Sequence, residues 1–193
     1  AQFSYSVYDG SWNSLPDFTS LTPIDTGTSN AIDVSVTSQV ETFGLVFSAQ
    51  ITVETAATYD FQTHSDDGSK LYIDAVTVVD NDGLHAPQTQ HGSIFLAVGT
   101  YNLRVEFFEK GGGEILEVLY RVQGGDYTSI PAHGLLDGYV PGKHEIGDWG
   151  AVINWPEIAI SAANLPDGRV LTWSSTETNA FPSSTEFTHA SVF

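Results

Sequence analysis

Short apolar runs with a period of two residues constrain the fold of this chain more than any other feature. In the run from Phe43 to Val53, apolar residues occupy every second position, and mostly small or polar residues fall between them. Such alternation is typical of a β-strand with one buried face. Further runs of this kind, separated by Gly, Asp, Asn and Pro, cover residues 58–62, 70–74, 76–79, 94–98, 101–108 and 115–122. The spacing predicts an all-β chain folded as an antiparallel β-sandwich or barrel.

The two ends of the chain differ from this central part. The first 42 residues are richer in Ser, Thr and Pro, and they hold one predicted strand, residues 3–8, among long ordered loops. Near the other end, residues 157–165 and 170–175 flank the turn Pro166-Asp167-Gly168-Arg169, which predicts a β-hairpin with residues 186–193 as a third strand. The expected domains are a sandwich over residues 1–138, a linker over 139–145 and a small β segment over 146–193.

The charge balance restricts the possible partners. The chain has 24 Asp and Glu against 6 Lys and Arg, a net charge of -18. So negative a protein repels nucleic acid and anionic membrane surfaces and attracts cations. No apolar stretch approaches the roughly 20 residues of a membrane helix, so we expect no membrane insertion. The chain lacks Cys and Met and begins with Ala1. A start without Met implies that a preceding segment was removed, which together with the acidity predicts a secreted, extracellular protein.

Two acidic turns flank one short apolar run. The first is Asp66-Asp67-Gly68 and the second is Asp80-Asn81-Asp82-Gly83. Both could be ordinary surface turns in which Asp side chains cap backbone amides. Alternatively, their carboxylates could form a cation site, because calcium takes six to eight hard oxygen ligands.

A resemblance favours the cation site. The segments HSDDGSKLYID, VVDNDGLH and GSIFLAVGTYNLRVEFFEKGGGEILEVLYR occur in this order. They resemble the PA-fourteen domain family, named after the anthrax protective antigen, over about residues 3 to 130. The resemblance implies an antiparallel β-sandwich or barrel. Members of the family include yeast flocculins and bacterial adhesins that bind sugars, and inserts in glycosidases and toxins, so the fold does not settle the function.

The resemblance also implies a site. In the sugar-binding branch of the family, two adjacent Asp residues joined by a cis peptide hold calcium, which takes two vicinal hydroxyls of a sugar. The matching metal ligands here are Asp66 and Asp67, with Asp80 and Asp82 in a supporting role. A second loop completes the site in that branch, usually with Asn or Asp, whereas the matching loop here, Glu109 to Glu114, has neither and carries a Lys. The expected ligand-binding residues are Asp66, Asp67, Gly111, Gly112, Gly113 and Glu114.

A second resemblance concerns the end of the chain. Residues 146–181, IGDWGAVINWPEIAISAANLPDGRVLTWSSTETNAF, are similar to the first kelch-type propeller blade of galactose oxidase and glyoxal oxidase. Those copper radical oxidases need a Cys crosslinked to Tyr and ligands from later blades. This chain has no Cys, and it shows no nucleophile elbow or phosphate loop. It is therefore predicted to have no catalytic activity of its own.

The preferred hypothesis is an extracellular, calcium-assisted, lectin-like or adhesin-like module that binds a glycan or polysaccharide. Two alternatives remain. One is a structural subunit of a filament or oligomer that self-associates through its C-terminal strands. The other is an accessory domain of a copper radical oxidase whose catalytic part lies elsewhere.

Overall fold

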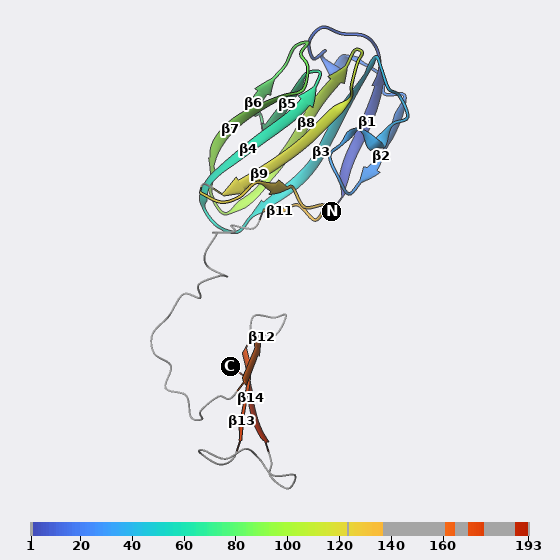
Figure 1. Cartoon of the computed structure of the whole chain (residues 1–193). Helices are drawn as coiled ribbons and strands as arrows, with labels where there is room; N and C mark the ends of the chain where they lie inside the picture. Colours follow the sequence, from blue (N-terminus) through green and yellow to red (C-terminus); the bar gives the residue numbers. More distant parts are fainter. Residues whose placement is uncertain (1, 123, 137–160, 165–169, 176–187, 193) are drawn as a thin grey trace. The chain divides into compact units, whose positions relative to one another are not determined.

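The protein is described by a computed structural model covering residues 2–122, 124–136, 161–164, 170–175 and 188–192. The chain divides into two compact units, Ala1–Gly147 and Asp148–Phe193. The described residues contain β-strands and two short 3-10 helices (Figure 1). No helix among them is long and apolar enough to cross a membrane.

Among the described residues, eleven strands belong to the first unit. In chain order its elements are β1 (Phe3–Asp9), η1 (Phe18–Ser20), β2 (Asp25–Ser29), η2 (Val34–Val36), β3 (Phe43–Val53), β4 (Ala57–Asp66), β5 (Ser69–Ile73), β6 (Val76–Asn81), β7 (Gln88–Leu96), β8 (Gly99–Glu109), β9 (Ile115–Val122), β10 (Thr128–Ser129) and β11 (Leu135–Leu136). Both 3-10 helices are N-capped by an Asp side chain that accepts a hydrogen bond from a backbone amide two residues on.

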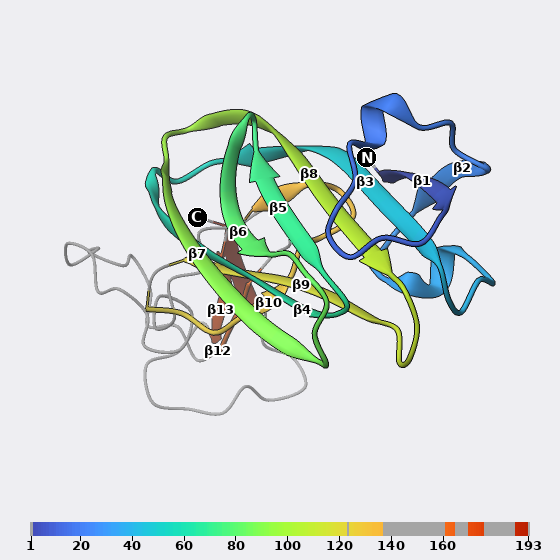
Figure 2. The same ribbon diagram turned by 90° about the horizontal axis from the view of Figure 1, so that it is seen from above.

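These strands form two sheets packed face to face (Figures 1 and 2). One sheet has the order β2-β1-β3-β8-β5-β6, with β11 added in parallel to the end of β3. The other has the order β10-β9-β4-β7. All other pairings in the two sheets are antiparallel. The architecture is therefore the all-β sandwich that the period-two pattern predicts.

The core lies between the sheets and follows the alternation in the sequence. Every second residue of β3, β8 and β9 points inward, and the largest fully buried side chains are Tyr59, Phe3, Phe43, Phe47, Phe61, Phe107 and Phe108. Burying a Phe or Leu side chain contributes about 1.5–3 kcal/mol, so this cluster is the main source of stability. Along β4, however, the inward positions change from Tyr59 and Phe61 to the buried polar residues Thr63 and Ser65.

The sandwich closes along the edge where β6 and β7 meet, although these strands belong to different sheets (Figures 1 and 2). Gly92 in β7 packs against the backbone of Val78 in β6 so closely that a Cβ atom at residue 92 would overlap the Val78 carbonyl oxygen. Farther along the same edge, the Asn81 side chain donates a hydrogen bond to the Gln88 backbone carbonyl and accepts one from the Gln88 side-chain amide.

Most predicted strands are confirmed, and the differences have physical causes. The expectation of a single strand in the first 42 residues is wrong, because β2 pairs with β1 along its whole length. Its sequence, Asp-Thr-Gly-Thr-Ser, lacks apolar residues because β2 is a mostly exposed edge strand. Strand β7 begins at Gln88, six residues before the predicted run, because its first half is exposed and polar.

The described residues of the second unit form an antiparallel sheet of the order β12-β13-β14, with β12 at Ser161–Asn164, β13 at Val170–Ser175 and β14 at Thr188–Val192. Asn164 pairs with Val170, as the predicted hairpin requires. The predicted third strand is also present as β14. The turn 166–169 and the expected linker 139–145 lie outside the described residues.

Candidate metal centre

Three carboxylates converge at one end of the sandwich. Asp66 ends β4, Asp67 follows it in the turn to β5, and Glu109 ends β8. Each offers an oxygen atom, and these oxygens all lie within 4.8 Å of one another. The peptide bond between Asp66 and Asp67 is cis, as the resemblance implied.

Asp67 is held by two other loops. Its Oδ1 accepts a hydrogen bond from the His85 backbone amide (3.1 Å), and its Oδ2 accepts one from the Lys110 backbone amide (3.1 Å). The residue is only 5% exposed. The β4–β5, β6–β7 and β8–β9 loops are therefore fixed to one another through a single side chain.

Glu109 is fully buried, yet its two oxygens have different environments. Oε2 accepts a hydrogen bond from the Asp67 backbone amide (3.0 Å), whereas Oε1 has no hydrogen-bond partner among the described residues. Burial, followed by the negative charge of Asp67, raises the pKa of Glu109 to about 7. The N–H groups of Gly111 and Asp67 oppose this rise. Burial and the charge of Asp67 also raise the pKa of the half-buried Asp66 carboxyl.

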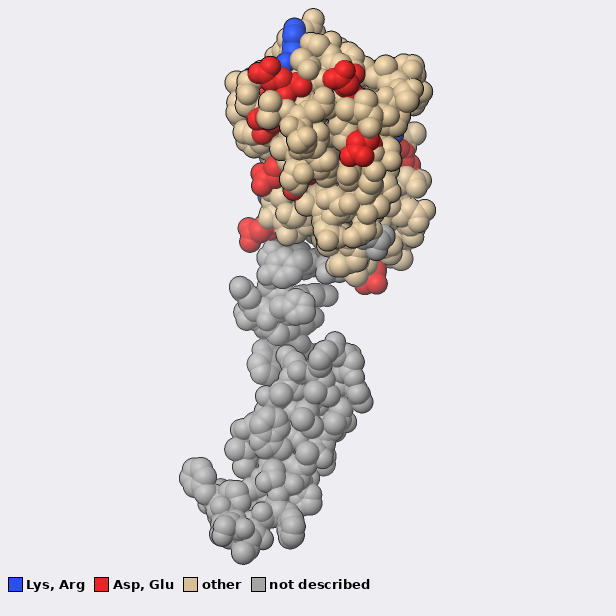
Figure 3. Space-filling view, turned by 90° about the vertical axis from the view of Figure 1, so that its right-hand side faces the viewer, with Lys and Arg blue, Asp and Glu red and all other residues tan. Residues whose placement is uncertain are grey.

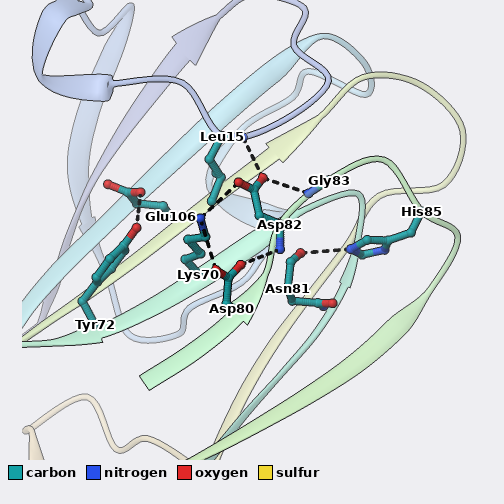
Figure 4. Close-up of polar contacts among 9 residues, drawn as sticks. All are labelled: Leu15, Lys70, Tyr72, Asp80, Asn81, Asp82, Gly83, His85 and Glu106. Atoms are coloured by element: carbon teal, nitrogen blue, oxygen red, sulfur yellow. Dashed lines mark hydrogen bonds and ion pairs between the residues drawn. The ribbon is translucent and has the colours of Figure 1, made fainter. Parts of the chain in front are cut away.

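The second acidic turn has a different environment (Figure 4). Lys70 Nζ lies 3.4 Å from Asp80 Oδ2 and 3.2 Å from Asp82 Oδ2, so both carboxylates have a cationic partner. Asp82 Oδ1 also accepts hydrogen bonds from the Leu15 amide (2.7 Å) and the Gly83 amide (2.8 Å). Asp82 thus fastens the β6–β7 loop to the neighbouring β1–β2 loop, whereas Asp80 contacts Lys70 and the Asp82 amide. Their carboxylates are not among the three that converge.

The glycine loop passes beside the carboxylates. A Cβ atom at Gly113 would lie 3.8 Å from Asp66 Oδ2, whereas one at Gly112 would meet nothing within 4 Å. Gly112 has a φ of 126°, a backbone conformation that favours glycine. Glu114 is half-buried and precedes Ile115, whose Cα is paired with that of Asp66. The structure thus brings Gly113 and Glu114 next to Asp66, while Gly111 and Gly112 form the exposed tip.

The chemistry of this donor set fits a hard divalent cation. Carboxylate oxygens are the ligands that calcium prefers, and the buried Oε1 of Glu109 has no hydrogen-bond partner among the described residues, which a bound cation would supply. Among the described residues, no Lys or Arg forms an ion pair with any of the three carboxylates. Asp66, Asp67 and Glu109 could therefore hold a cation.

Two residues at this site were not predicted. From the sequence, Glu109 is the first residue of the second loop, in which the family pattern places Asn or Asp, so its carboxylate is not among the predicted ligands. The signal that could have found it is a Glu at the inward-facing end of the alternating run 99–109. The role of His85 could not be read from its side chain, because its backbone amide makes the contact with Asp67.

The face of the first unit that Figure 3 draws carries more acidic than basic side chains. Asp and Glu side chains are scattered over the face in Figure 3, where few Lys or Arg atoms are visible. Two cavities, of about 310 and 360 Å³, lie elsewhere, and both are lined by residues of β9, β10 and nearby loops. Neither cavity shares a residue with the three carboxylates.

Comparison with protein families identifies the first unit. A family model described as the PA14 domain matches residues 5–134, which is more than half of the chain. The chain belongs to the PA14 domain family. The matched region contains Asp66, Asp67 and Glu109 together with all three loops around them. No curated protein matches the chain.

Solved structures support the PA14 fold at low sequence identity. The PA14 domain of the MpAFP antifreeze protein has a TM-score of 0.60 and 16% identity, over 72% of this chain and 94% of that one. The PA14 sugar-binding domain of an RTX adhesin has a TM-score of 0.56 and 16% identity, over 68% and 96%. The A domain of epithelial adhesin 9 from Candida glabrata, solved with Galβ1-4GlcNAc, has a TM-score of 0.52 and 11% identity, over 66% and 85%.

These neighbours share the fold, and their ligands are properties of those proteins. The family match ends at residue 134. The kelch-type resemblance of residues 146–181 is not supported by the comparisons, and its PDGR turn lies outside the described residues.

Proposed function

We propose that the PA14 unit is an extracellular, lectin-like or adhesin-like module that binds a glycan through a calcium ion held by Asp66, Asp67 and Glu109. The observation that carries this proposal is the convergence of the three carboxylates, two of them buried, with no Lys or Arg paired to them among the described residues. The sugar-binding RTX adhesin domain and the ligand-bound epithelial adhesin add support, because both share the fold.

Burial makes the cluster suited to a cation. Carboxylates so close together repel one another, and burial strengthens that repulsion because it removes screening water. A bound cation would offset both effects. A pair of Asp side chains that merely capped turn amides would not need a third, buried carboxylate beside it, so the surface-turn alternative accounts less well for Glu109.

The protein residues and the ion would have separate tasks. When bound, calcium would supply open coordination positions for two hydroxyl groups of a sugar. Asp67 would hold the ion in a fixed place, because both of its oxygens are also anchored by backbone amides. The exposed tip of Gly111 and Gly112 would form one wall beside the sugar together with Gly113 and Glu114, and Asp80 and Asp82 would support the neighbouring loop.

Calcium titration by calorimetry, with and without sugars, tests the proposal. We expect saturable calcium binding by the full chain and sugar binding that EDTA abolishes. Asp66→Asn is the cleanest variant, because the described residues make no hydrogen bond to the Asp66 side chain and the change removes only charge. The matched control is Asp80→Asn, which changes the same residue type in the second turn. Absence of calcium binding by the wild-type chain would exclude the proposed site.

One observation favours the structural-subunit alternative. In the part of the second unit that the structure describes, β12 and β14 each pair with one strand, so each leaves one edge free. Free edges can add a strand from another molecule. Light scattering of the full chain over a range of concentrations tests this alternative, since a subunit that self-associates would show a rising mass.

A further inference from the structure

A chain of buried polar side chains lies directly beneath the three carboxylates. Its members come from β4, β5 and β6, and all are at most 2% exposed: Thr63, Ser65, Ser69 and Asn81. Ser65 immediately precedes Asp66, and Ser69 immediately follows Gly68. The network therefore joins the two ends of the turn that carries both Asp residues.

The hydrogen bonds in this network run in one direction. Asn81 Nδ2 donates to Ser65 Oγ (2.9 Å), and Ser69 Oγ donates to Thr63 Oγ1 (3.0 Å). A hydroxyl has a single hydrogen to donate. The contact of 2.7 Å between Ser65 and Ser69 must then use the Ser65 hydrogen. Hydrogen bonds arranged in this way polarise one another, so the connected network is more rigid than the same hydrogen bonds would be as isolated pairs.

Asn81 also connects the chain to the loop that holds Asp67. The second hydrogen of Nδ2 reaches Gln88 O (3.1 Å), and Oδ1 accepts from Gln88 Nε2 (2.8 Å), so the amide is fully used. Its backbone oxygen lies 3.0 Å from His85 Nε2 (Figure 4). His85 Nδ1 likewise lies 3.0 Å from Ala86 O, so the ring faces two backbone carbonyls, both of which can only accept. The His85 backbone amide in turn donates to Asp67 Oδ1.

We propose that this network, centred on Asn81, is a positioning device that holds the Asp66–Asp67 turn and the His85 loop at the spacing a calcium ion requires. The proposal rests on the proposed function, because it concerns the same site. None of the four side chains contacts the ion. Their effect is exerted through the backbone of residues 65–69 and through His85, and a relaxed core would allow these loops to separate.

The alternative is that the network only contributes to stability. A buried polar chain costs free energy unless every member is satisfied, so a stabilising role predicts that its loss weakens folding without any specific effect on calcium. The two roles are separated by comparing variants of similar stability, some of which interrupt the hydrogen-bond network and some of which leave it intact.

The test uses three variants of the full chain. Asn81→Leu replaces the side-chain amide by an apolar group of similar size. Ser65→Ala removes only the hydroxyl group at the middle of the hydrogen-bond network. Val79→Ala is the matched control, since Val79 lies on the same strand, is fully buried and belongs to the apolar core. Urea unfolding in EDTA establishes that each variant is folded before titration.

Two measurements report on the site. Calcium affinity is measured by calorimetry, and the number of waters on bound Eu³⁺ is obtained from its luminescence lifetime in H₂O and D₂O. We expect Asn81→Leu and Ser65→Ala to lower calcium affinity roughly 10- to 100-fold, as loss of groups that orient metal ligands does elsewhere. They should also increase the number of bound waters. Val79→Ala should lower stability and leave the affinity within about threefold of wild type.

The outcomes separate this proposal from the proposed function. If the wild-type chain binds no calcium, both fail together. If the wild-type chain binds calcium and the folded Asn81→Leu and Ser65→Ala variants bind it equally well, only the positioning role is overturned. An equal loss of affinity in Val79→Ala would also overturn it, because the effect would then follow stability alone.

Discussion

The two acidic turns of this protein are nearly alike in sequence and differ in what surrounds them. Asp80 and Asp82 share the Lys70 ammonium group, and Asp82 also caps two backbone amides. Asp66 and Asp67 instead meet a third carboxylate, Glu109, and no Lys or Arg of the described residues pairs with them. The same residue types thus form a turn whose charge Lys70 neutralises in one place and a cluster of uncompensated carboxylates in the other. The difference depends on whether the neighbouring strand supplies a Lys or a Glu.

The largest expected effect follows from removing charge from the uncompensated cluster. Glu109→Gln should reduce calcium affinity at least 100-fold, which corresponds to about 2.7 kcal/mol, because it removes a buried ligand while keeping the shape. Asp82→Asn in the other turn should change the affinity by no more than a few-fold. Calorimetric titration of both variants would reveal a similar loss if the two turns were in fact equivalent.

A glycine in each turn gives the next comparison. A Cβ at Gly68 would lie 2.5 Å from Phe108 Cε1, 2.8 Å from Gly83 N and 2.9 Å from Gly83 O, so Gly68→Ala must move backbone. We expect a loss of about 2–3 kcal/mol in the free energy of unfolding, as for an overpacked site. Gly83 has open space but a φ of 112°, so Gly83→Ala should cost only about 1 kcal/mol. Urea denaturation in EDTA measures both values, and the reverse order would contradict this account of the turns.

The pH dependence of stability should differ between a protein with and without the Glu109 carboxyl. Folding raises the pKa of Glu109 from 4.5 to about 7, so folding favours its protonated form. The resulting contribution to the free energy of unfolding is fully present below pH 4.5 and is lost as the pH rises through 7. In EDTA, the wild type should lose about 1–2 kcal/mol between pH 5 and pH 8 that Glu109→Gln does not lose. Unfolding curves for both proteins at four pH values provide the difference, and parallel curves would show that Glu109 does not titrate in this range.

The smallest effect should come from the compensated turn. Lys70→Met removes the cation shared by Asp80 and Asp82 but keeps the apolar stem, and the pairs are partly exposed. Such pairs are worth about 0.2–1 kcal/mol. Calcium affinity should rise slightly or stay unchanged, since one positive charge near the site is lost. A large fall in calcium affinity for Lys70→Met would mean that the second turn positions the first more strongly than its contacts indicate.

Local patterns predicted the fold better than they predicted the site. Strand β3 was predicted with its observed ends because apolar residues alternate with other residues from Phe43 to Val53, as burial of one face of the strand requires. Strand β2 was missed because its hydrogen bonds to β1 are made by the backbone and leave no apolar pattern. For the site, the Asp66–Asp67 pair is visible in one short segment, whereas Glu109 is 42 residues away and joins it only because β8 pairs with β5.

Supporting contacts could not have been predicted for the same reason. The amides of His85 and Lys110 hold Asp67, and every non-proline residue has such an amide. The residue type therefore carries no signal of the role. The polar core residues Thr63, Ser65 and Ser69 do interrupt an apolar pattern, but only the stacking of the two sheets shows that they touch.

Gly92 has a further consequence for how the sandwich can change. Strands β6 and β7 meet there through the bare backbone of one residue and not through a shared ladder. The missing side chain is what admits the Val78 carbonyl, so any larger residue at position 92 would act as a wedge between the two sheets. The wedge would enter the same edge that Asn81 and Gln88 fasten farther along. In such a variant, this edge would be where the two layers separate.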